Sequence, residues 1–588
     1  MATRRGVRFV LVLIALAVFV SAACLALVSM VMTGGPAVAN ESTLVLRPGG
    51  DLAEVAPSDV LGQFIGGNET TVRGFVDNLE KARRDPRVTG VLLRPSTISS
   101  PYWGKLQELR DAVIRFRASG KPVVAFLEYG GEREYYLASA ADAVYLLPTS
   151  PLDLTGVASY EMFLRGALDK LGAYPDFLHV GDYKTAINQF TEKGFTPTHR
   201  EMSEALNRDA YDQLVHAIAE ARKKTDAEVR GLFDQGPFTP QQAKDAGLVD
   251  DLAYEDELDD RAGNLGLGTD ADYLEGTDYQ RVSLASLGVR PRSRIAVLYI
   301  VGTIVSGKST YDATSGELVG SDTVVDQIRR IRRDSDVKAI VLRIDSPGGS
   351  SVASDVIWRE LTITREQQPA RPIIASMSDL AASGGYYVAL PAQTIVAQPG
   401  TLTGSIGVFM GKVAIGGTLE KLGVTTETVK SGKNADVYSP VSAFTPEQRE
   451  KLGEYMQVFY STFVEKVAAS RRSTPDKIHA VAQGRVWTGA QARERGLVDE
   501  LGGLDRAVAV AKMAANIPAD EDVQLVAYPA RRSFYETLTE QFGRGSMLSQ
   551  LKTALAGNDI SALATLSSPL RIFRRGEPLA LMPFSVLK

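Results

Sequence analysis

Two glycine-rich segments contain residues that could catalyse acyl transfer. The first, Asp345–Gly349, reads Asp-Ser-Pro-Gly-Gly, and its glycines could direct backbone N–H groups at one point, as an oxyanion hole requires. The second, Ala381–Tyr387, places Ser383 directly before a Gly-Gly pair, at the start of a helical pattern. A helix N-terminus favours the negative charge of a serine alkoxide. Either segment alone is typical of a tight turn, whereas the two together indicate a catalytic pair.

Short apolar strands and one amphipathic helix are expected to position these segments. Strands are predicted at Ile295–Val301, Val337–Ile344 and Ile373–Met377. A helix capped by Ser321 is predicted between the first two strands. Its apolar positions recur with a period of 3.6 residues, at Val324, Val325, Ile328 and Ile331. This alternation indicates βαβ units, a mostly parallel sheet and an α/β fold.

The chain repeats itself at a nearly constant spacing. Arg83–Arg94 resembles Arg332–Arg343, and Gln242–Asp250 resembles Gln491–Asp499. A third match, between the two Leu-Asp/Glu-Lys-Leu-Gly segments that end at Gly172 and Gly423, has almost the same offset. Such agreement predicts a tandem duplication of one domain.

The repeat divides the chain into four parts. Residues 1–35 form a basic tip and an apolar segment, 44–285 and 292–528 form the two α/β repeats, and 529–588 form an extension. The extension has a partly helical, amphipathic pattern and is expected to pack on the body of the protein.

Composition excludes several classes of function. The 588 residues include 65 basic and 70 acidic side chains in a mixed pattern, so the chain has no basic footprint for nucleic acid. The single cysteine, Cys24, lies in the apolar N-terminal segment and leaves no pair for a disulfide or a thiolate zinc site. The four histidines lack the spacing of a zinc-protease helix. No metal and no other cofactor is expected.

Residues 9–32 are uncharged and almost wholly apolar, which is enough for one transmembrane helix of about 20 residues. Arg4, Arg5 and Arg8 precede this segment and should stay in the cytoplasm, which predicts catalytic domains on the extracytoplasmic side of the cytoplasmic membrane. A cleaved signal peptide ending at residues 37–39 is the alternative, but its apolar region would normally be only about 7–15 residues long.

Three motifs resemble the signal peptide peptidase A family, also called protease IV, in its long, duplicated form. They are Leu342–Gly349, Ala382–Tyr386 and Leu402–Val408. The resemblance covers nearly the whole chain, and it implies a fold similar to the Clp protease and crotonase superfamily. It also implies a serine endopeptidase without cofactors that degrades remnant signal peptides and other apolar peptides, and a homotetramer.

The same resemblance assigns roles to individual residues. Ser383 would be the nucleophile, Lys184 of the Gly-Asp-Tyr-Lys motif would be the base, and Ser405 would hydrogen-bond that lysine. A lysine acts as a base only when neutral, and burial lowers its pKa. Backbone N–H groups of Gly349 and Gly384 are expected to form the oxyanion hole, with Gly348 and Gly385 in support.

The alignment of the repeats predicts one active site per chain. Ser383 falls opposite Glu132 and Gly384 opposite Arg133, while Lys184 falls opposite Ala435. Each repeat therefore retains one half of a Ser-Lys dyad, and the site should lie where the two repeats meet.

Three other readings compete with the peptidase. Gly302–Ser309 satisfies the spacing of a nucleotide-binding P-loop, but the residues that follow lack the helical pattern a P-loop requires, so no nucleotide is expected. A crotonase-like enzyme acting on acyl thioesters would use similar glycine-rich loops without a serine nucleophile. A non-catalytic membrane scaffold would need neither Ser383 nor Lys184.

Overall fold

The computed structural model describes residues 38–55, 71–263, 265–267, 273–312, 316–367, 370–529, 578–582 and 586–587. The proposed anchor, residues 9–32, lies outside these ranges, as do residues 530–577, where the extension was expected to be partly helical. Within the described ranges, no helix combines the length and apolarity needed to cross a bilayer.

The first repeat is built on a parallel sheet with the strand order β10-β1-β2-β3-β5-β9. The strands are β1 (Ser42–Leu46), β2 (Val88–Leu93), β3 (Val123–Leu127), β5 (Ala143–Leu146), β9 (Asp251–Leu252) and β10 (Tyr273–Glu275). The helices that follow or cover them are α3 (Val72–Arg84), α4 (Gly104–Arg117), α5 (Glu132–Ala138), α8 (Pro197–Arg222), α9 (Asp226–Phe233), α10 (Pro240–Asp245), α11 (Leu258–Gly263) and α12 (Gly276–Tyr279). The short strands β4 (Gly130–Gly131) and β6 (Leu152–Asp153) pair beside it.

The second repeat has the same plan in the parallel order β23-β11-β15-β17-β18-β22, and β19 and β21 form a second branch from β17. Its strands are β11 (Ser293–Val301), β15 (Val337–Ser346), β17 (Ile373–Ala382), β18 (Thr394–Ala397), β19 (Leu402–Gly404), β21 (Val486–Thr488), β22 (Glu500–Leu501) and β23 (Val523–Tyr528). Its helices are α13 (Ser321–Arg333), α14 (Ser351–Glu366), α15 (Gly384–Ala389), α17 (Pro446–Ser470), α18 (Pro475–Val481), α19 (Gly489–Glu494) and α20 (Leu504–Ala514). Strand β17 is buried along its whole length, as central parallel strands are.

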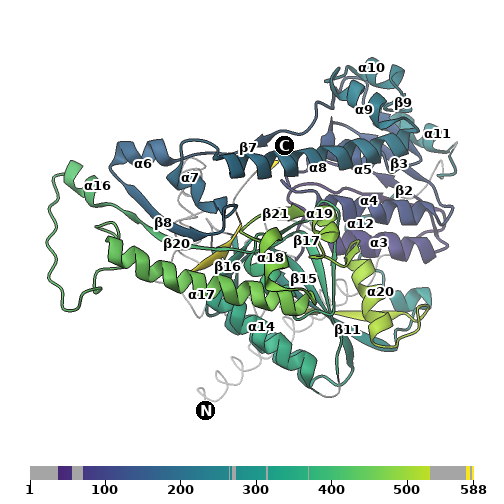
Figure 1. The fold of residues 1–588 in the computed structure, drawn as a ribbon. Helices are drawn as coiled ribbons and strands as arrows, with labels where there is room; N and C mark the ends of the chain where they lie inside the picture. Colours follow the sequence, from purple (N-terminus) through teal and green to yellow (C-terminus); the bar gives the residue numbers. More distant parts are fainter. Residues whose placement is uncertain are drawn as a thin grey trace, which may run out of the picture.

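A third sheet joins the two repeats. Its order is β13-β14-β12-β16-β24-β20-β8, and β8 (Tyr174–Val180) of the first repeat pairs antiparallel with β20 (Val408–Ala414) of the second. The others are β12 (Thr303–Val305), β13 (Thr310–Asp312), β14 (Gly316–Gly320), β16 (Gly348–Ser350) and β24 (Leu579–Leu581). Figure 1 shows β8 and β20 as a ribbon that extends from the body to α6 (Arg165–Leu171) and α16 (Gly416–Lys421).

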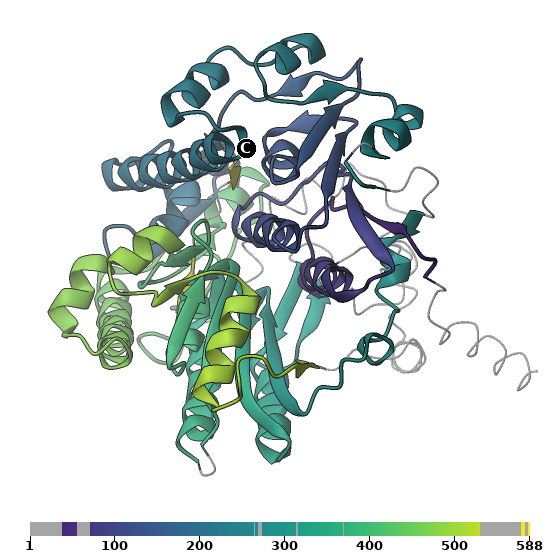
Figure 2. The same cartoon turned by 90° about the vertical axis from the view of Figure 1, so that its right-hand side faces the viewer.

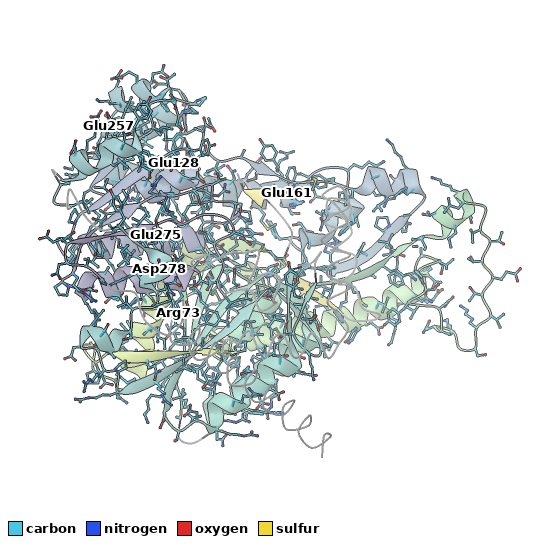
Figure 3. The ribbon with its side chains drawn as sticks, turned by 180° about the vertical axis from the view of Figure 1, so that it is seen from behind. Arg73, Glu128, Glu161, Glu257, Glu275 and Asp278 are labelled. Carbon is cyan, nitrogen blue, oxygen red and sulfur yellow. The ribbon has the colours of Figure 1, made fainter. Side chains whose placement is uncertain are left out.

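Helices α3 and α4 of the first repeat lie between the two large sheets (Figure 2). Arg73 on α3 donates to Leu525 O in β23, at 3.1 Å, and is labelled in Figure 3. Four acidic residues labelled in the same view lie on the first repeat and are each paired with an arginine: Glu128 with Arg94, Glu257 with Arg261, Glu275 with Arg47 and Asp278 with Arg281.

The structure confirms the α/β elements predicted from periodicity and corrects two details. Strand β17 continues five residues past Met377, to Ala382, so Ser383 follows the strand directly. Helix α13 has Gly320 at its N-cap without a side-chain bond, and Ser321 is already its first residue. Ser321 therefore does not cap the helix as predicted; its hydroxyl instead accepts from Gly307 N.

A fully buried arginine bridges the repeats. Arg343 in β15 donates to Glu54 at 2.8 and 2.6 Å and to Glu108 of α4 at 2.8 Å. Burial opposes the ionisation of Glu54, but Arg343 and Lys105 nearby still lower its pKa. Burial raises the pKa of Glu108. The repeats are thus joined by one cation shared between two carboxylates, in addition to their apolar contacts.

Replacing Arg343 with methionine should therefore lower the free energy of unfolding by about 3–5 kcal/mol, because two buried carboxylates lose their counter-charge. The loss should grow from about pH 5 to about pH 8, since the folded variant retains protons that the unfolded chain releases. Denaturant unfolding at several pH values measures both effects. Arg115→Met, which removes an exposed inter-repeat pair with Asp505, is the control and should cost less than about 1 kcal/mol.

Candidate active site

Ser383 occupies the turn between β17 and α15. Its backbone has φ 55° and ψ −111°, a conformation that is strained for a residue with a side chain. Two backbone hydrogen bonds hold it there: Ser383 N donates to Gly404 O at 2.8 Å, and Tyr387 N donates to Ser383 O at 2.9 Å. The turn therefore presents the hydroxyl at the N-terminus of α15, where the sequence analysis expected it.

Lys184 reaches Ser383 from the other repeat. It follows β8 after a turn at Gly181, and its side chain is fully buried. Its Nζ lies 2.8 Å from Ser383 Oγ, 3.0 Å from Ser405 Oγ and 3.0 Å from Ser405 O. The pairing of β8 with β20 sets this approach, because Ser405 lies three residues before β20 begins.

Burial lowers the pKa of Lys184 well below its usual value. Within the part of the chain that the structure describes, burial is the one cause that acts on this pKa, and it disfavours the charged form. The lysine is therefore better suited to accept a proton from Ser383 than an exposed lysine would be.

The glycines predicted for the oxyanion hole lie together beside Ser383. A Cβ added to Gly384 would lie 3.1 Å from Gly349 N, and one added to Gly348 would lie 2.7 Å from Gly384 N. Gly348 and Gly349 have φ of 101° and 152°, which side chains rarely permit. Gly385 packs on Ser346, where a Cβ would lie 2.7 Å from its carbonyl oxygen. All four positions thus need glycine for close backbone approach.

A loop that the sequence analysis missed supports both Lys184 and Ser405. Tyr183 N donates to Gln483 O at 2.9 Å, Ser405 N donates to Arg485 O at 2.7 Å, and Gly484 N donates to Ile406 O at 2.7 Å. Gly484 has φ 81°, and a Cβ there would lie 2.5 Å from Lys184 N. The sequence does contain a sign of this loop, because the Gln-Gly pair at 483–484 repeats the pair at 235–236 of the first repeat.

The first repeat has a different residue at the position equivalent to Ser383. Glu132, opposite Ser383 in the alignment, begins α5 and accepts from Thr155 N and Thr155 Oγ1, both at 3.0 Å. Its carboxylate thus holds a loop of the first repeat in place and, among the described residues, has no hydrogen bond to a lysine.

The P-loop reading fails on geometry. Gly302–Ser309 leads into strand β13 and not into a helix, so the segment lacks the helix N-terminus that would hold phosphates. In the part of the chain that the structure describes, no group of His, Cys, Asp and Glu side chains is arranged to hold a metal ion.

Substituting Gly484 with alanine should impair the site while leaving the fold intact, because the new Cβ must push the Lys184 backbone away from Ser383. We expect kcat/KM to fall by about 10²-fold, the cost of a displacement on the order of 1 Å. Peptide hydrolysis and thermal melting measure the two effects. Gly496→Ala has a similar positive φ, 71°, but open space around the Cβ, and should retain normal activity. Equal losses in both variants would mean that backbone strain alone matters.

Comparison with known proteins identifies close relatives along most of the chain. The chain is 37% identical to the chloroplastic serine protease SPPA of Arabidopsis thaliana over 76% of its own length and 66% of that protein. It is 35% identical to Protease 4 of Salmonella typhi, covering 76% and 73% of the two chains. It is 30% identical to Protease 4 of Haemophilus influenzae, covering 83% and 81%.

Similarity to solved structures is weaker. A membrane-bound stomatin-specific protease aligns with 40% of this chain and 97% of its own at 17% identity, with a TM-score of 0.25. That score is too low to support an argument about the fold, so the likeness to the Clp protease and crotonase superfamily stays a prediction.

The family model for peptidase family S49 matches the chain twice, at residues 115–266 and 365–518. One match falls in each repeat, in agreement with the duplication seen in the sheets. With relatives of this identity and coverage, the chain belongs to peptidase family S49 and is a serine peptidase of that family.

Proposed function

We propose that Ser383 and Lys184 form a Ser-Lys catalytic dyad and that the chain is an endopeptidase for apolar peptides. The observation that carries this proposal is the 2.8 Å separation of Lys184 Nζ and Ser383 Oγ in a fully buried setting. The nucleophile and the base come from different repeats, so one site forms per chain.

Acylation begins when the neutral Lys184 amine takes the Ser383 proton while Oγ attacks the peptide carbonyl carbon. The carbonyl oxygen becomes an oxyanion held by Gly349 N and Gly384 N. As the intermediate collapses, the C–N bond breaks and the Lys184 ammonium gives its proton to the leaving amine. Ser383 is left as an acyl ester.

Deacylation repeats these steps with water. Lys184 takes a proton from the water as it attacks the ester carbonyl, and the oxyanion is held by the same two glycines. The C–O bond to Ser383 then breaks, the proton returns to Oγ and the carboxylic acid leaves. Ser405 keeps the lysine amine directed at Ser383 throughout, by its hydroxyl and carbonyl contacts.

Strand β24, near the C-terminus, supports the proposal of an extended peptide substrate. It pairs antiparallel with β16, with Ala580 opposite Gly349, and Met582 N donates to Pro347 O at 2.9 Å. On its other edge β24 meets β20 at Phe409. An extended peptide that adds a strand between β16 and β20 would make the same backbone contacts beside the dyad.

The side chains of this segment indicate an apolar preference. Leu579 and Leu581 pack in one cluster with Phe177, Phe190 and Phe409. Met582 packs in another with Met202 and Val486. Remnant signal peptides, which the family resemblance implies as substrates, are apolar in this way. The proposed anchor at residues 9–32 would hold the site near such peptides on the outer side of the cytoplasmic membrane.

The dyad is tested by the pH dependence of kcat/KM. Because burial lowers the pKa of Lys184, activity should be lost as pH falls through that lowered value, which lies well below the pKa of an exposed lysine. Ser383→Ala and Lys184→Met should each lower kcat by roughly 10⁴-fold or more in folded protein. Ser383 of the wild type should be labelled by a fluorophosphonate, whereas a crotonase-like enzyme would not be. Normal turnover by folded Ser383→Ala would falsify the dyad.

A second experiment tests the peptide groove. Deleting residues 578–588 should raise kcat/KM for a short apolar peptide on the order of ten-fold, because a tethered competitor at high effective concentration is removed. Deleting only residues 586–588 leaves β24 in place and should have little effect. A folded 578–588 deletion whose kcat/KM is unchanged or lower would mean that β24 is a structural strand and not a substrate mimic.

A further inference from the structure

A bulge in the central sheet lies directly before both catalytic segments. Strands β15 and β17 pair at Ile344 and Met377 and next at Ser346 and Ala381, so β17 has two more residues than β15 in this interval. Bulges of this kind redirect the residues that follow them. Here Asp345 leads into the Ser346–Gly349 loop, and Asp379 leads toward Ser383.

Asp345 replaces the ladder contact that the bulge removes. Its Oδ1 accepts from Leu380 N at 3.1 Å, and its carbonyl accepts from Gly302 N at 2.9 Å. The carboxylate thus links β15, which leads into the oxyanion glycines, to β17, which leads into Ser383.

Helix α4 of the first repeat abuts this bulge with its N-terminus. A Cβ on Gly104 would lie 2.7 Å from Ser378 O, so the helix approaches as closely as a glycine allows. Asp379 Oδ1 accepts from Lys105 N at 2.8 Å and satisfies an N-terminal N–H of the helix from across the repeat boundary.

The Lys105 side chain then turns back onto the two carboxylates. Its Nζ lies 2.8 Å from Asp345 Oδ2 and 3.5 Å from Asp379 Oδ2. The exposed fractions of the three side chains are 8%, 11% and 2%. One buried cation therefore separates two buried carboxylates that would otherwise repel each other.

Burial and the neighbouring charges make Asp345 easier to protonate than an exposed aspartate. Burial raises the pKa of Asp345 to about 6 although Lys105 opposes the rise, and Asp379 and Glu54 add to it. Burial disfavours the charged form of Lys105, but Asp345 and Asp379 outweigh it and raise its pKa. Ser100 donates to Asp379 Oδ2 at 3.1 Å, and Tyr102 and Arg133 also lie close enough to Asp379 to interact with its charge.

We propose that Lys105 is a positioning residue, which holds Asp345 and Asp379 so that the bulge directs the oxyanion glycines and Ser383 at one point. The inference rests on the proposed dyad. It gives the first repeat a second role in catalysis, because Lys105 touches neither substrate nor reacting atoms and acts through the bulge.

The test uses Lys105→Met in the full chain, with a fluorogenic apolar peptide as the probe. We expect kcat to fall about 10²-fold, as for the loss of one oxyanion donor, with KM within about three-fold of wild type. Without the cation, one carboxylate keeps its proton to higher pH, so the acid limb of kcat should move upward by about one unit or more.

Two further variants separate positioning from folding. Lys105→Met combined with Asp379→Asn removes one anion together with the cation. The asparagine oxygen can still accept from the backbone N–H of residue 105. We expect this double variant to melt near the wild-type temperature, to regain at least ten-fold in kcat and to move the acid limb back. Lys105→Arg should also restore part of kcat. Arg115→Met, on the same helix, should behave as wild type.

Each result decides the question. A Lys105→Met protein with wild-type kcat and an unmoved acid limb would overturn the proposal, as would a loss confined to KM. If Lys105→Met does not fold, the double variant still decides: a folded double variant with no more activity than the Ser383→Ala background would exclude the charge balance as the cause. Failure of the dyad itself is distinct, since wild type would then escape fluorophosphonate labelling.

Discussion

The architecture depends on keeping one lysine amine out of water. Burial lowers the pKa of Lys184, and the first repeat could not bury this residue by itself, because Ser383, Ser405 and the Gln483–Arg485 loop all come from the second repeat. The shared sheet follows from this requirement. Strands β8 and β20 pair across the boundary between the repeats. The register of this pairing determines where the Lys184 amine meets Ser383.

Duplication supplied two copies of one strand-turn-helix, and divergence made them different. In the second repeat the turn holds a serine in a strained conformation. In the first repeat the same place holds Glu132, which is used for loop closure. Helix α4 shows a comparable change of use, since its N-terminus abuts the sheet of the other repeat. An element of one repeat thus supports the site formed mainly by the other.

Local sequence patterns predicted the strands, the helices and the position of Ser383, because periodicity and glycine pairs act over a few residues. Lys184 could not be selected from spacing, since its partner lies in the other repeat; the family resemblance supplied it. The sequence also could not predict three contacts: the bulge at Asp345, the packing of Gly104 against β17 and the register of β24. They depend on contacts between segments separated by hundreds of positions, and a single sequence carries no measure of such distances. The importance of Gly484 could have been predicted from the repeat, because the Gln-Gly pair occurs at the matching place in both copies.

The proposed division of the dyad between the repeats would also order events in time. A ribosome makes residue 184 long before residues 383 and 405, so the first repeat emerges with a lysine that has no serine to activate. On this proposal, that lysine would stay solvated and charged until β20 pairs with β8. Peptidase activity would then appear only when the last third of the chain has been made, and an incomplete chain would not cleave peptides.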